Sequence, residues 1–299
     1  MSDIEKLNKY IQEGSVGELN MSWSELAGVY LPKANLSKIN LFKADLTGAD
    51  LSGADLSGAT LIETDLSDVN LSGAILTGAN LSSAVLTSVN LSGANLSGAN
   101  LSDVMLFAGN LSGAILTGAK ISGEISFADL SGADLTNADL CDAELFDANL
   151  TEAKLTKTKL TGANLTKADL QKAVLTNANL MHANLSSANL SWADLNATNF
   201  SKANLTCTNL RFVILVKAKL NNANFSDADL TGANMSEASI IGANFYEACL
   251  EGANLFKANL TKANLLRANL SKANLSEANL SGVNLNEMSG ADLTKIKRH

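Results

Sequence analysis

One apolar residue returns every five positions along almost the whole chain. This central position runs from Met21 to Ile121, resumes at Ile125 and continues to Leu285, which gives 54 five-residue units. It is Leu in 46 units and Met, Ile or Phe in the others. Two residues earlier stands a small position, which is Ala in 39 units, and between the two lies a polar position, mostly Asn or Asp. A hydroxyl position (mostly Ser or Thr) and a variable position (rich in Gly, Lys and Glu) complete the unit.

A period of five fits neither the 3.6-residue period of an α-helix nor the two-residue period of an ordinary strand. On an α-helix each five-residue step turns the side chain by about 500°, so the central residues would form no apolar stripe. The many Gly and Asn residues also disfavour a flat sheet. The pattern therefore predicts a chain that turns a corner every five residues, with the central and small side chains inside and the other three outside.

The units that begin at residue 34 read ANLSK, INLFK, ADLTG and ADLSG. This A(D/N)LXX signature resembles the pentapeptide-repeat family over nearly the whole chain. The resemblance implies an all-β protein, a right-handed quadrilateral parallel β-helix, whereas the periodicity alone also allows three sides. Right-handedness agrees with the rule for parallel crossovers. Four sides give coils of four pentapeptides, and about 13 coils at a spacing of about 4.8 Å would make a rod of roughly 65 Å.

The two ends of the repeat differ from its middle. Ser2 and Glu5 form a capping box for a helix that places Ile4, Leu7 and Ile11 on one face, and Gly14 is a suitable end. We expect this helix to cover the open end of the first coil, where unpaired backbone would otherwise recruit other strands. The expected segments are a capping helix and lead-in over 1–18, the β-helix over 19–287 and a C-terminal cap or tail over 288–299.

Two further features concern continuity and assembly. The C-terminal segment offers Leu293 and Ile296 with a basic tail, as a short helix or a dimer contact. Some members of the family dimerise at this end, but a monomer is expected here rather than a C-terminal dimer. Between Ile121 and Ile125 the step is four residues, so the register breaks at 122–125. Gly123 occupies a position that is normally Ala and suits a tightened turn, so we interpret the break as a tolerated deletion that slightly kinks the rod.

Charge and cysteine content exclude several classes of protein. The net charge of −8 disfavours direct binding of nucleic acid. The three cysteines lie far apart and indicate neither a disulfide framework nor a metal site. No apolar run reaches membrane-spanning length and the N-terminus has no signal-peptide core, so a cytoplasmic protein without a membrane contact is expected.

Charge is distributed unevenly along the chain. The net charge is −2 over residues 1–33, −11 over 34–150 and +5 over 151–299. A solvated surface is the ordinary explanation, although such polarity could also orient a partner or align molecules head to tail. Side chains of the expected acidic surface are Asp45, Asp50, Asp55 and Asp65.

Two groups of outward apolar residues are candidate contact sites. Trp192 and Phe212 occupy the same position of units that lie one coil apart and should stack in one column, with Ile214 and Val216 beside Phe212. Phe107, Phe127 and Phe146 gather around the register break. Contiguous exposed aromatic residues often mark interaction sites. The alternative is local packing, which we favour for the three phenylalanines because the break offers a corner to cover.

Catalytic chemistry has no basis in this sequence. The only histidines, His182 and His299, are expected on the surface, and no base is placed to activate a Ser or Thr. Acidic residues recur on a convex surface, whereas acid–base catalysis needs a concave site that shifts pKa values. The glycines recur singly and form no phosphate-binding loop. We therefore expect no enzyme activity and no cofactor.

The leading functional hypothesis is a non-catalytic scaffold or regulatory protein that binds an unidentified protein partner. The family resemblance supports this class and suggests a bacterial source. The alternative, implied by relatives that inhibit gyrase or protect it from quinolones, is a DNA-mimicking binder of type II topoisomerase (DNA gyrase). The basic second half and the lack of projecting loops argue against mimicry. Binding of ice or mineral through Ser and Thr arrays is disfavoured, because these residues occur on all faces rather than on one.

Overall fold

The computed structural model describes residues 1–14 and 18–284. The expected contacts of Leu293 and Ile296, and His299, lie outside the described residues. The chain divides into two compact units, Met1–Asn149 and Leu150–His299, and each is treated by itself below. The sequence does not predict a division within the repeat, because the five-residue period runs through the boundary between these units.

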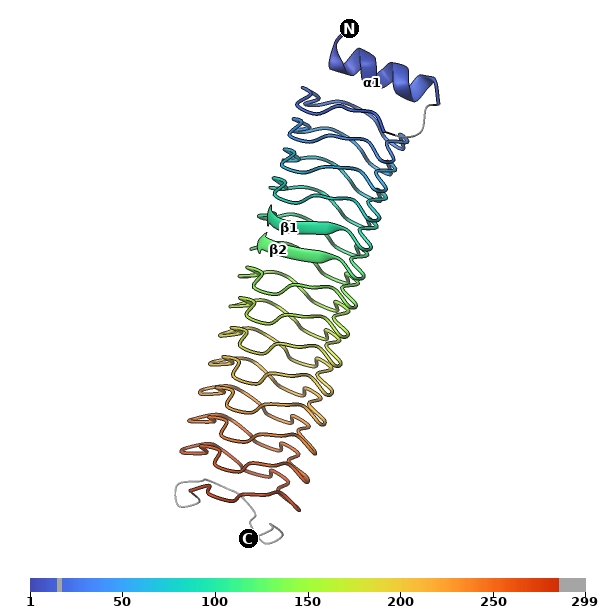
Figure 1. The fold of residues 1–299 in the computed structure, drawn as a ribbon. Helices are drawn as coiled ribbons and strands as arrows, with labels where there is room; N and C mark the ends of the chain where they lie inside the picture. The colour runs from blue at the N-terminus through green and yellow to red at the C-terminus, as the bar shows by residue number, and fades with distance from the viewer. Residues whose placement is uncertain (15–17, 285–299) are drawn as a thin grey trace. The chain divides into compact units, whose positions relative to one another are not determined.

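Within each unit the polar positions pair as isolated parallel bridges between residues four pentapeptides apart, as Asn20 pairs with Asn40 in unit 1 and Asn184 with Asn204 in unit 2. One turn of the chain therefore takes four pentapeptides, and successive turns stack as a β-helix (Figure 1). The backbone N–H of a central residue donates to the polar-position carbonyl of the next coil, for example Leu51 to Asn70 at 2.8 Å. Two stretches are long enough to be strands, β1 (Asn100–Met105) and β2 (Lys120–Glu124), which pair in parallel.

The core consists of the central and small positions, as the periodicity predicts. Nearly all of these side chains are buried, from Leu26 in unit 1 to Leu275 in unit 2. Phe225 and Phe245 replace Leu in successive coils and stack with ring centroids 4.8 Å apart. Where Thr replaces Ala inside, its hydroxyl finds a backbone acceptor: Thr64 donates to the carbonyl of Leu41 at 2.8 Å. Burial of the repeat's apolar stripe is the main stabilising contribution.

Each corner is a tight turn between the central residue and the next small residue. The small-position N–H donates to the preceding central carbonyl, as Ala54 does to Leu51 at 3.0 Å. The variable residue has a positive φ in every described pentapeptide, whereas the hydroxyl residue before it does not. This combination defines a type II turn. Before the turn, the polar side chain accepts the backbone N–H two residues on, as Asp50 accepts that of Ser52 at 2.9 Å. Gly, Asn and Asp are therefore favoured in this repeat because of turn chemistry.

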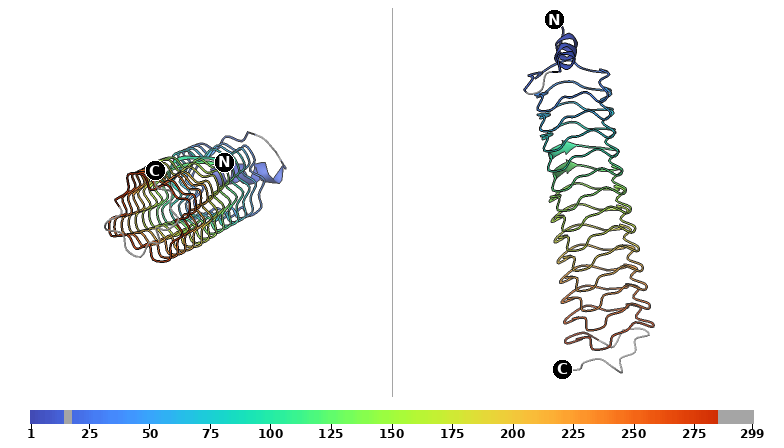
Figure 2. Two further views of the ribbon diagram at one scale, coloured as in Figure 1. Left: turned by 90° about the horizontal axis from the view of Figure 1, so that it is seen from below. Right: turned by 90° about the vertical axis from the view of Figure 1, so that its right-hand side faces the viewer.

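Helix α1 (Asp3–Gln12) covers the first coils of unit 1 (Figures 1 and 2). Its capping box between Ser2 and Glu5 is present as predicted, and Gly14 follows its end with φ +60°. Of the three apolar residues expected on its inner face only Leu7 is fully buried, while Ile4 remains 41% exposed. Helix α1 also contacts the edge of the first coil through polar groups: the Lys6 ammonium donates a hydrogen bond to the carbonyl of Asn20 at 2.7 Å.

The register break falls on β2, where Gly123 is at the same time a variable-position residue and a small-position residue of the repeat. It has a positive φ of +102°, as a variable-position residue does, and its carbonyl accepts the N–H of Glu144 at 3.0 Å, as a small-position residue does. A Cβ at Gly123 would lie 2.4 Å from the carbonyl oxygen of Val104. Beside it, the Ser122 hydroxyl accepts the N–H of Asp103 at 3.0 Å, a role that a backbone carbonyl has in the other coils. The missing residue is thus accommodated by a glycine and one side-chain hydrogen bond.

Candidate interaction surfaces

Trp192 and Phe212 form a stacked pair on the surface of unit 2. Both occupy variable positions in successive coils, and their ring centroids lie 4.5 Å apart with an interplanar angle of 24°. Trp192 is 60% exposed and Phe212 39% exposed. Ile214, two residues after Phe212, is 41% exposed, and Val216 is half-buried.

The Phe212 ring lies over the backbone of Gly232, the next residue of its column. A Cβ at Gly232 would meet Cδ1 of Phe212 at 2.6 Å, whereas a Cβ at Gly252, one coil further, would have no atom within 4 Å. The two glycines have nearly the same φ, at +68° and +66°. The stack therefore depends on a glycine at one position of this column and not at the next.

Charged residues around the aromatic pair are engaged with neighbours in the same unit. The Arg211 guanidinium is 5.5 Å from the centroid of the Phe212 ring and 2.9 Å from a carboxylate oxygen of Asp229. Lys172 contacts Glu152 at 3.1 Å across one coil step. Such exposed pairs contribute little to stability but neutralise charge locally. The patch is therefore an apolar surface with a charge-balanced border.

The three phenylalanines near the break form an edge-to-face series in unit 1. The ring centroids of Phe107 and Phe127 are 5.2 Å apart, and those of Phe127 and Phe146 are 5.5 Å apart. Phe107 and Phe127 are each 45% exposed, and Phe146 is half-buried. The rings thus pack on one another along a corner, which agrees with local packing while leaving apolar surface exposed.

A further aromatic group was not predicted. Trp23 and Phe42 meet edge-to-face with ring centroids 6.0 Å apart, and the Lys43 ammonium lies 4.7 Å from the centroid of the Trp23 ring. Tyr30 is exposed in the same first coils. Trp23 holds a variable position and Phe42 a hydroxyl position, so a search for aromatic residues at equivalent positions of successive coils does not find this pair.

The four aspartates of the expected acidic surface lie in three columns. Asp45 and Asp65 are bridged neighbours in one column, whereas Asp50 and Asp55 belong to the next two. Hydrogen bonds from the Thr47 hydroxyl and backbone N–H lower the pKa of Asp45. Hydrogen bonds from the backbone N–H and hydroxyl of Ser52 likewise lower the pKa of Asp50. Both carboxylates therefore carry their charge at neutral pH.

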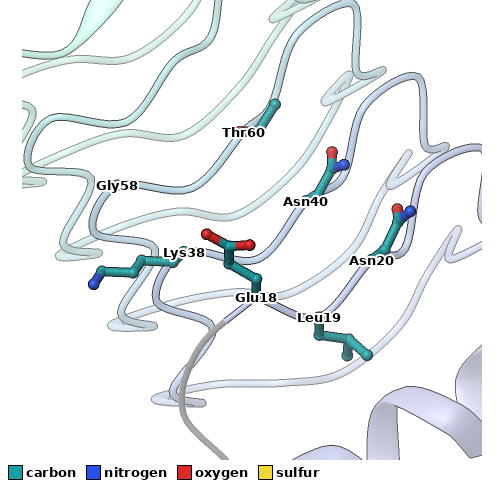
Figure 3. Close-up of a pocket in the computed structure, with 7 residues that line it drawn as sticks. All are labelled: Glu18, Leu19, Asn20, Lys38, Asn40, Gly58 and Thr60. Atoms are coloured by element: carbon teal, nitrogen blue, oxygen red, sulfur yellow. The ribbon is translucent and has the colours of Figure 1, made fainter.

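The start of the β-helix has an open polar depression. Its column of Asn20, Asn40 and Thr60 is flanked by Glu18 and Lys38 (Figure 3). The remaining lining comes from Leu19 and Gly58. These groups offer hydrogen bonds and one pair of opposite charges but no nucleophile–base pair.

A second depression, of about 530 Å³, lies at the register break and includes Asp103, Lys120, Asp139, Cys141 and Asp142. Across the described residues no group of three or more His, Cys, Asp or Glu side chains is placed to hold a metal ion. His182, the histidine within the described repeat, is exposed as predicted. No helix within residues 1–14 and 18–284 is long and apolar enough to cross a membrane.

These features define a parallel β-helical repeat protein that presents surface columns of side chains. The pentapeptide-repeats family model matches residues 20–58 and 64–103 and, in overlapping segments, 124–286. The chain belongs to the pentapeptide-repeat family. No curated protein matches it significantly.

Several solved structures resemble the chain. One is HetL, a pentapeptide repeat protein involved in heterocyst differentiation regulation from the cyanobacterium Nostoc, with 31% identity over 94% of this chain and 98% of HetL and a TM-score of 0.37. Another is QnrB1, a plasmid-mediated fluoroquinolone resistance protein, with 22% identity over 58% of this chain and 90% of QnrB1 and a TM-score of 0.47. A third is a pentapeptide repeat protein of the Arabidopsis thaliana thylakoid lumen, with 31% identity over 34% of this chain and 77% of that protein and a TM-score of 0.31.

Proposed function

We propose that this protein is a non-catalytic scaffold or regulatory protein of the cytoplasm that binds another protein through the Trp192–Phe212 patch. The observation that carries the proposal is the stacked, exposed ring pair with Ile214 and Val216 beside it. Large aromatic side chains dominate the binding energy of many protein interfaces, and contiguous exposed apolar residues often mark such sites. The border of paired charges would supply the polar rim that surrounds an apolar contact.

The absence of enzyme activity is part of the same proposal. Pentapeptide repeat proteins are generally non-catalytic. Neither of the two depressions described above is lined by a histidine, and His182 is exposed on the surface. A rigid surface that positions a partner is consistent with these observations.

The proposal is tested by quantitative affinity capture from a bacterial lysate. Wild-type protein, Trp192→Ala/Phe212→Ala and a control, Phe107→Ala/Phe127→Ala, are compared, and bound proteins are measured by mass spectrometry. A specific partner should be retained by the wild type and the control and lost from the Trp192/Phe212 variant. Equal retention by all three proteins would exclude the patch as the contact.

A second pair of variants tests the ring geometry without removing a ring. Gly232→Ala places a methyl group where Phe212 lies, so it should displace the stack and lower partner retention. Gly252→Ala has the same kind of backbone and open space, so it should retain the partner as the wild type does. Equal loss in the two variants would indicate a general structural effect rather than a contact through the rings.

The second candidate, a DNA-mimicking binder of DNA gyrase, is favoured by the acidic charge of unit 1, whose residues 1–149 hold 19 acidic and 6 basic side chains. Such a surface would compete for a basic DNA-binding groove, and its affinity would fall steeply with salt. Asp45→Asn/Asp65→Asn keeps the side-chain size and uses a residue common at the polar position. Under this candidate function, micromolar protein inhibits supercoiling and the variant inhibits less. Supercoiling that is unchanged by the wild-type protein would exclude it.

We further propose that the β-helix is right-handed and four-sided and contains about 13 coils. The support is that bridged residues lie four pentapeptides apart, as Asn184 and Asn204 do, together with the right-handed rule for parallel crossovers. A crystal structure of the full chain tests all three features directly, and a three-sided coil or a left-handed path would contradict the proposal.

A further inference from the structure

Much of the negative charge of unit 1 lies on one side of its coils, which we call the acidic face. This face consists of one column of polar positions and the two columns of variable positions that flank it. The middle column of this acidic face is a continuous series of bridged polar positions from Glu25 to Glu144. Ten acidic side chains and one basic side chain, Lys43, occupy the face. The acidic residues are Glu25, Asp45, Glu63, Asp65, Asp68, Asp103, Glu124, Asp142, Glu144 and Asp147. The face therefore carries −9 of the net −13 of residues 1–149.

Unit 2 contains a face of the opposite sign. Its middle column is the bridged series from Lys159 to Asn279, and the flanking variable positions supply most of the cations. Seven lysines and two acidic residues, Glu237 and Glu277, occupy this basic face. The lysines are Lys157, Lys159, Lys202, Lys217, Lys219, Lys257 and Lys262, all of which are exposed. This net charge of +5 equals the whole net charge of residues 151–299.

The two faces also match in length. Each middle column spans six coil steps, or about 29 Å at the usual strand spacing. Exposed large apolar side chains lie in both faces: Met105 at 56% exposed and Phe127 at 45% exposed in the acidic face, and Ile241 at 38% exposed in the basic face. A chain that carries two faces of equal length and opposite charge is complementary to a second copy of itself.

We propose that the acidic face of one molecule binds the basic face of a second copy of this chain. Opposite charges would align the two faces and raise the rate of encounter. Each face offers on the order of 300 Å², taking about 10 Å as the width of one side, so a single contact lies below the size of a stable interface. Self-association is therefore expected at micromolar protein and low salt and is weakened by screening. A polyanion such as DNA is a poorer occupant of the basic face, because the net charge of the molecule is −8.

The test is sedimentation velocity of the full chain at low salt and at 0.5 M NaCl, where the Debye length falls to roughly 4 Å. Wild-type protein should sediment as a larger species at low salt and as a monomer at high salt. Asp68→Lys/Asp147→Lys reverses charge on the acidic face, and Lys202→Glu/Lys262→Glu reverses it on the basic face. Lys and Glu already occupy variable positions elsewhere, so these variants should fold.

Each double variant alone should raise the dissociation constant at least tenfold, and an equimolar mixture of the two should restore association. The control is Lys154→Glu, an exposed lysine of unit 2 outside the basic face, which should associate within twofold of the wild type. Association that does not change with salt concentration, or a mixture of the two double variants that stays monomeric, would overturn the proposal. The proposal would also be overturned if the wild-type protein is monomeric at low salt and its basic-face variant loses retention on a DNA column. The basic face would then bind a polyanion.

Discussion

The register break allows a sharp test, because one glycine there has a backbone conformation that other residues avoid and lacks room for a side chain. Gly123 has φ +102°, outside the left-handed region near +60° that the other variable residues occupy. An added Cβ would lie 2.4 Å from the oxygen and 2.8 Å from the nitrogen of Val104, and these are backbone atoms that cannot rotate away. Gly123→Ala must therefore move β1 away from β2.

The expected cost has three contributions. Unfavourable φ costs about 1–3 kcal/mol, overpacking costs about 1–3 kcal/mol, and each weakened backbone hydrogen bond at the break costs about 1 kcal/mol. The contributions overlap, so we expect a total of roughly 3–5 kcal/mol for Gly123→Ala. Gly98→Ala is the matched control, because Gly98 has φ +64° and no atom within 4 Å of its Cβ. Non-glycine residues adopt this φ at 36 other positions, so the control should cost about 1 kcal/mol or less.

Long repeat arrays can unfold in parts, so the local and global measurements should be made together. Urea unfolding followed by far-ultraviolet circular dichroism gives the global change. Hydrogen–deuterium exchange of the peptides that contain β1 and β2 gives the local opening free energy. Faster exchange confined to these peptides in Gly123→Ala, and absent in Gly98→Ala, is the expected result. Equal effects of the two substitutions would refute the assignment of Gly123 to a double role.

Other predictions concern the core and the acidic residues. Leu185→Asp buries a carboxylate at a fully buried position of unit 2 and should abolish folding; a soluble protein with native circular dichroism would contradict the inward assignment. Thr64→Val removes the hydroxyl that donates to the Leu41 carbonyl and should cost about 1 kcal/mol in urea unfolding, and an unchanged stability would show that this bond contributes nothing. Asp45 should titrate in the folded protein below its ordinary pKa of 3.8, because the Thr47 hydroxyl and N–H stabilise its carboxylate. Its stabilisation is present above the unfolded pKa and is lost as pH falls through the folded pKa, which carboxyl NMR checks; a folded pKa at or above 3.8 would contradict it.

Much of the fold follows from the sequence because the period of five is long and consistent. The inward positions and the Ser2–Glu5 capping box agree with the pattern, since each depends on residue type at a fixed spacing. Bridges between residues four pentapeptides apart were expected only from the family resemblance, because the period alone also allows three sides. The packing of helix α1 was predicted less accurately. Ile4 stays exposed because hydrophobic spacing on a short helix does not specify how deeply its first turn packs.

The surface was only partly predictable. Trp192 and Phe212 can be found because they share one position in successive coils, but the contact of Phe212 with Gly232 depends on which way the ring leans. The pairing of Trp23 with Phe42 crosses from one type of position to another. The acidic face appears only when its columns are aligned through the register break, where the step from one coil to the next is one residue shorter than elsewhere.

The central claim, that the exposed Trp192–Phe212 stack is the binding surface, is tested most directly by the fluorescence of Trp192 itself. Trp23→Phe leaves Trp192 as the only indole, since the chain has two tryptophans. Titration with the partner retained in affinity capture should shift its emission to shorter wavelength and protect it from acrylamide quenching. A partner that binds this variant while the emission and quenching of Trp192 stay unchanged would contradict the claim.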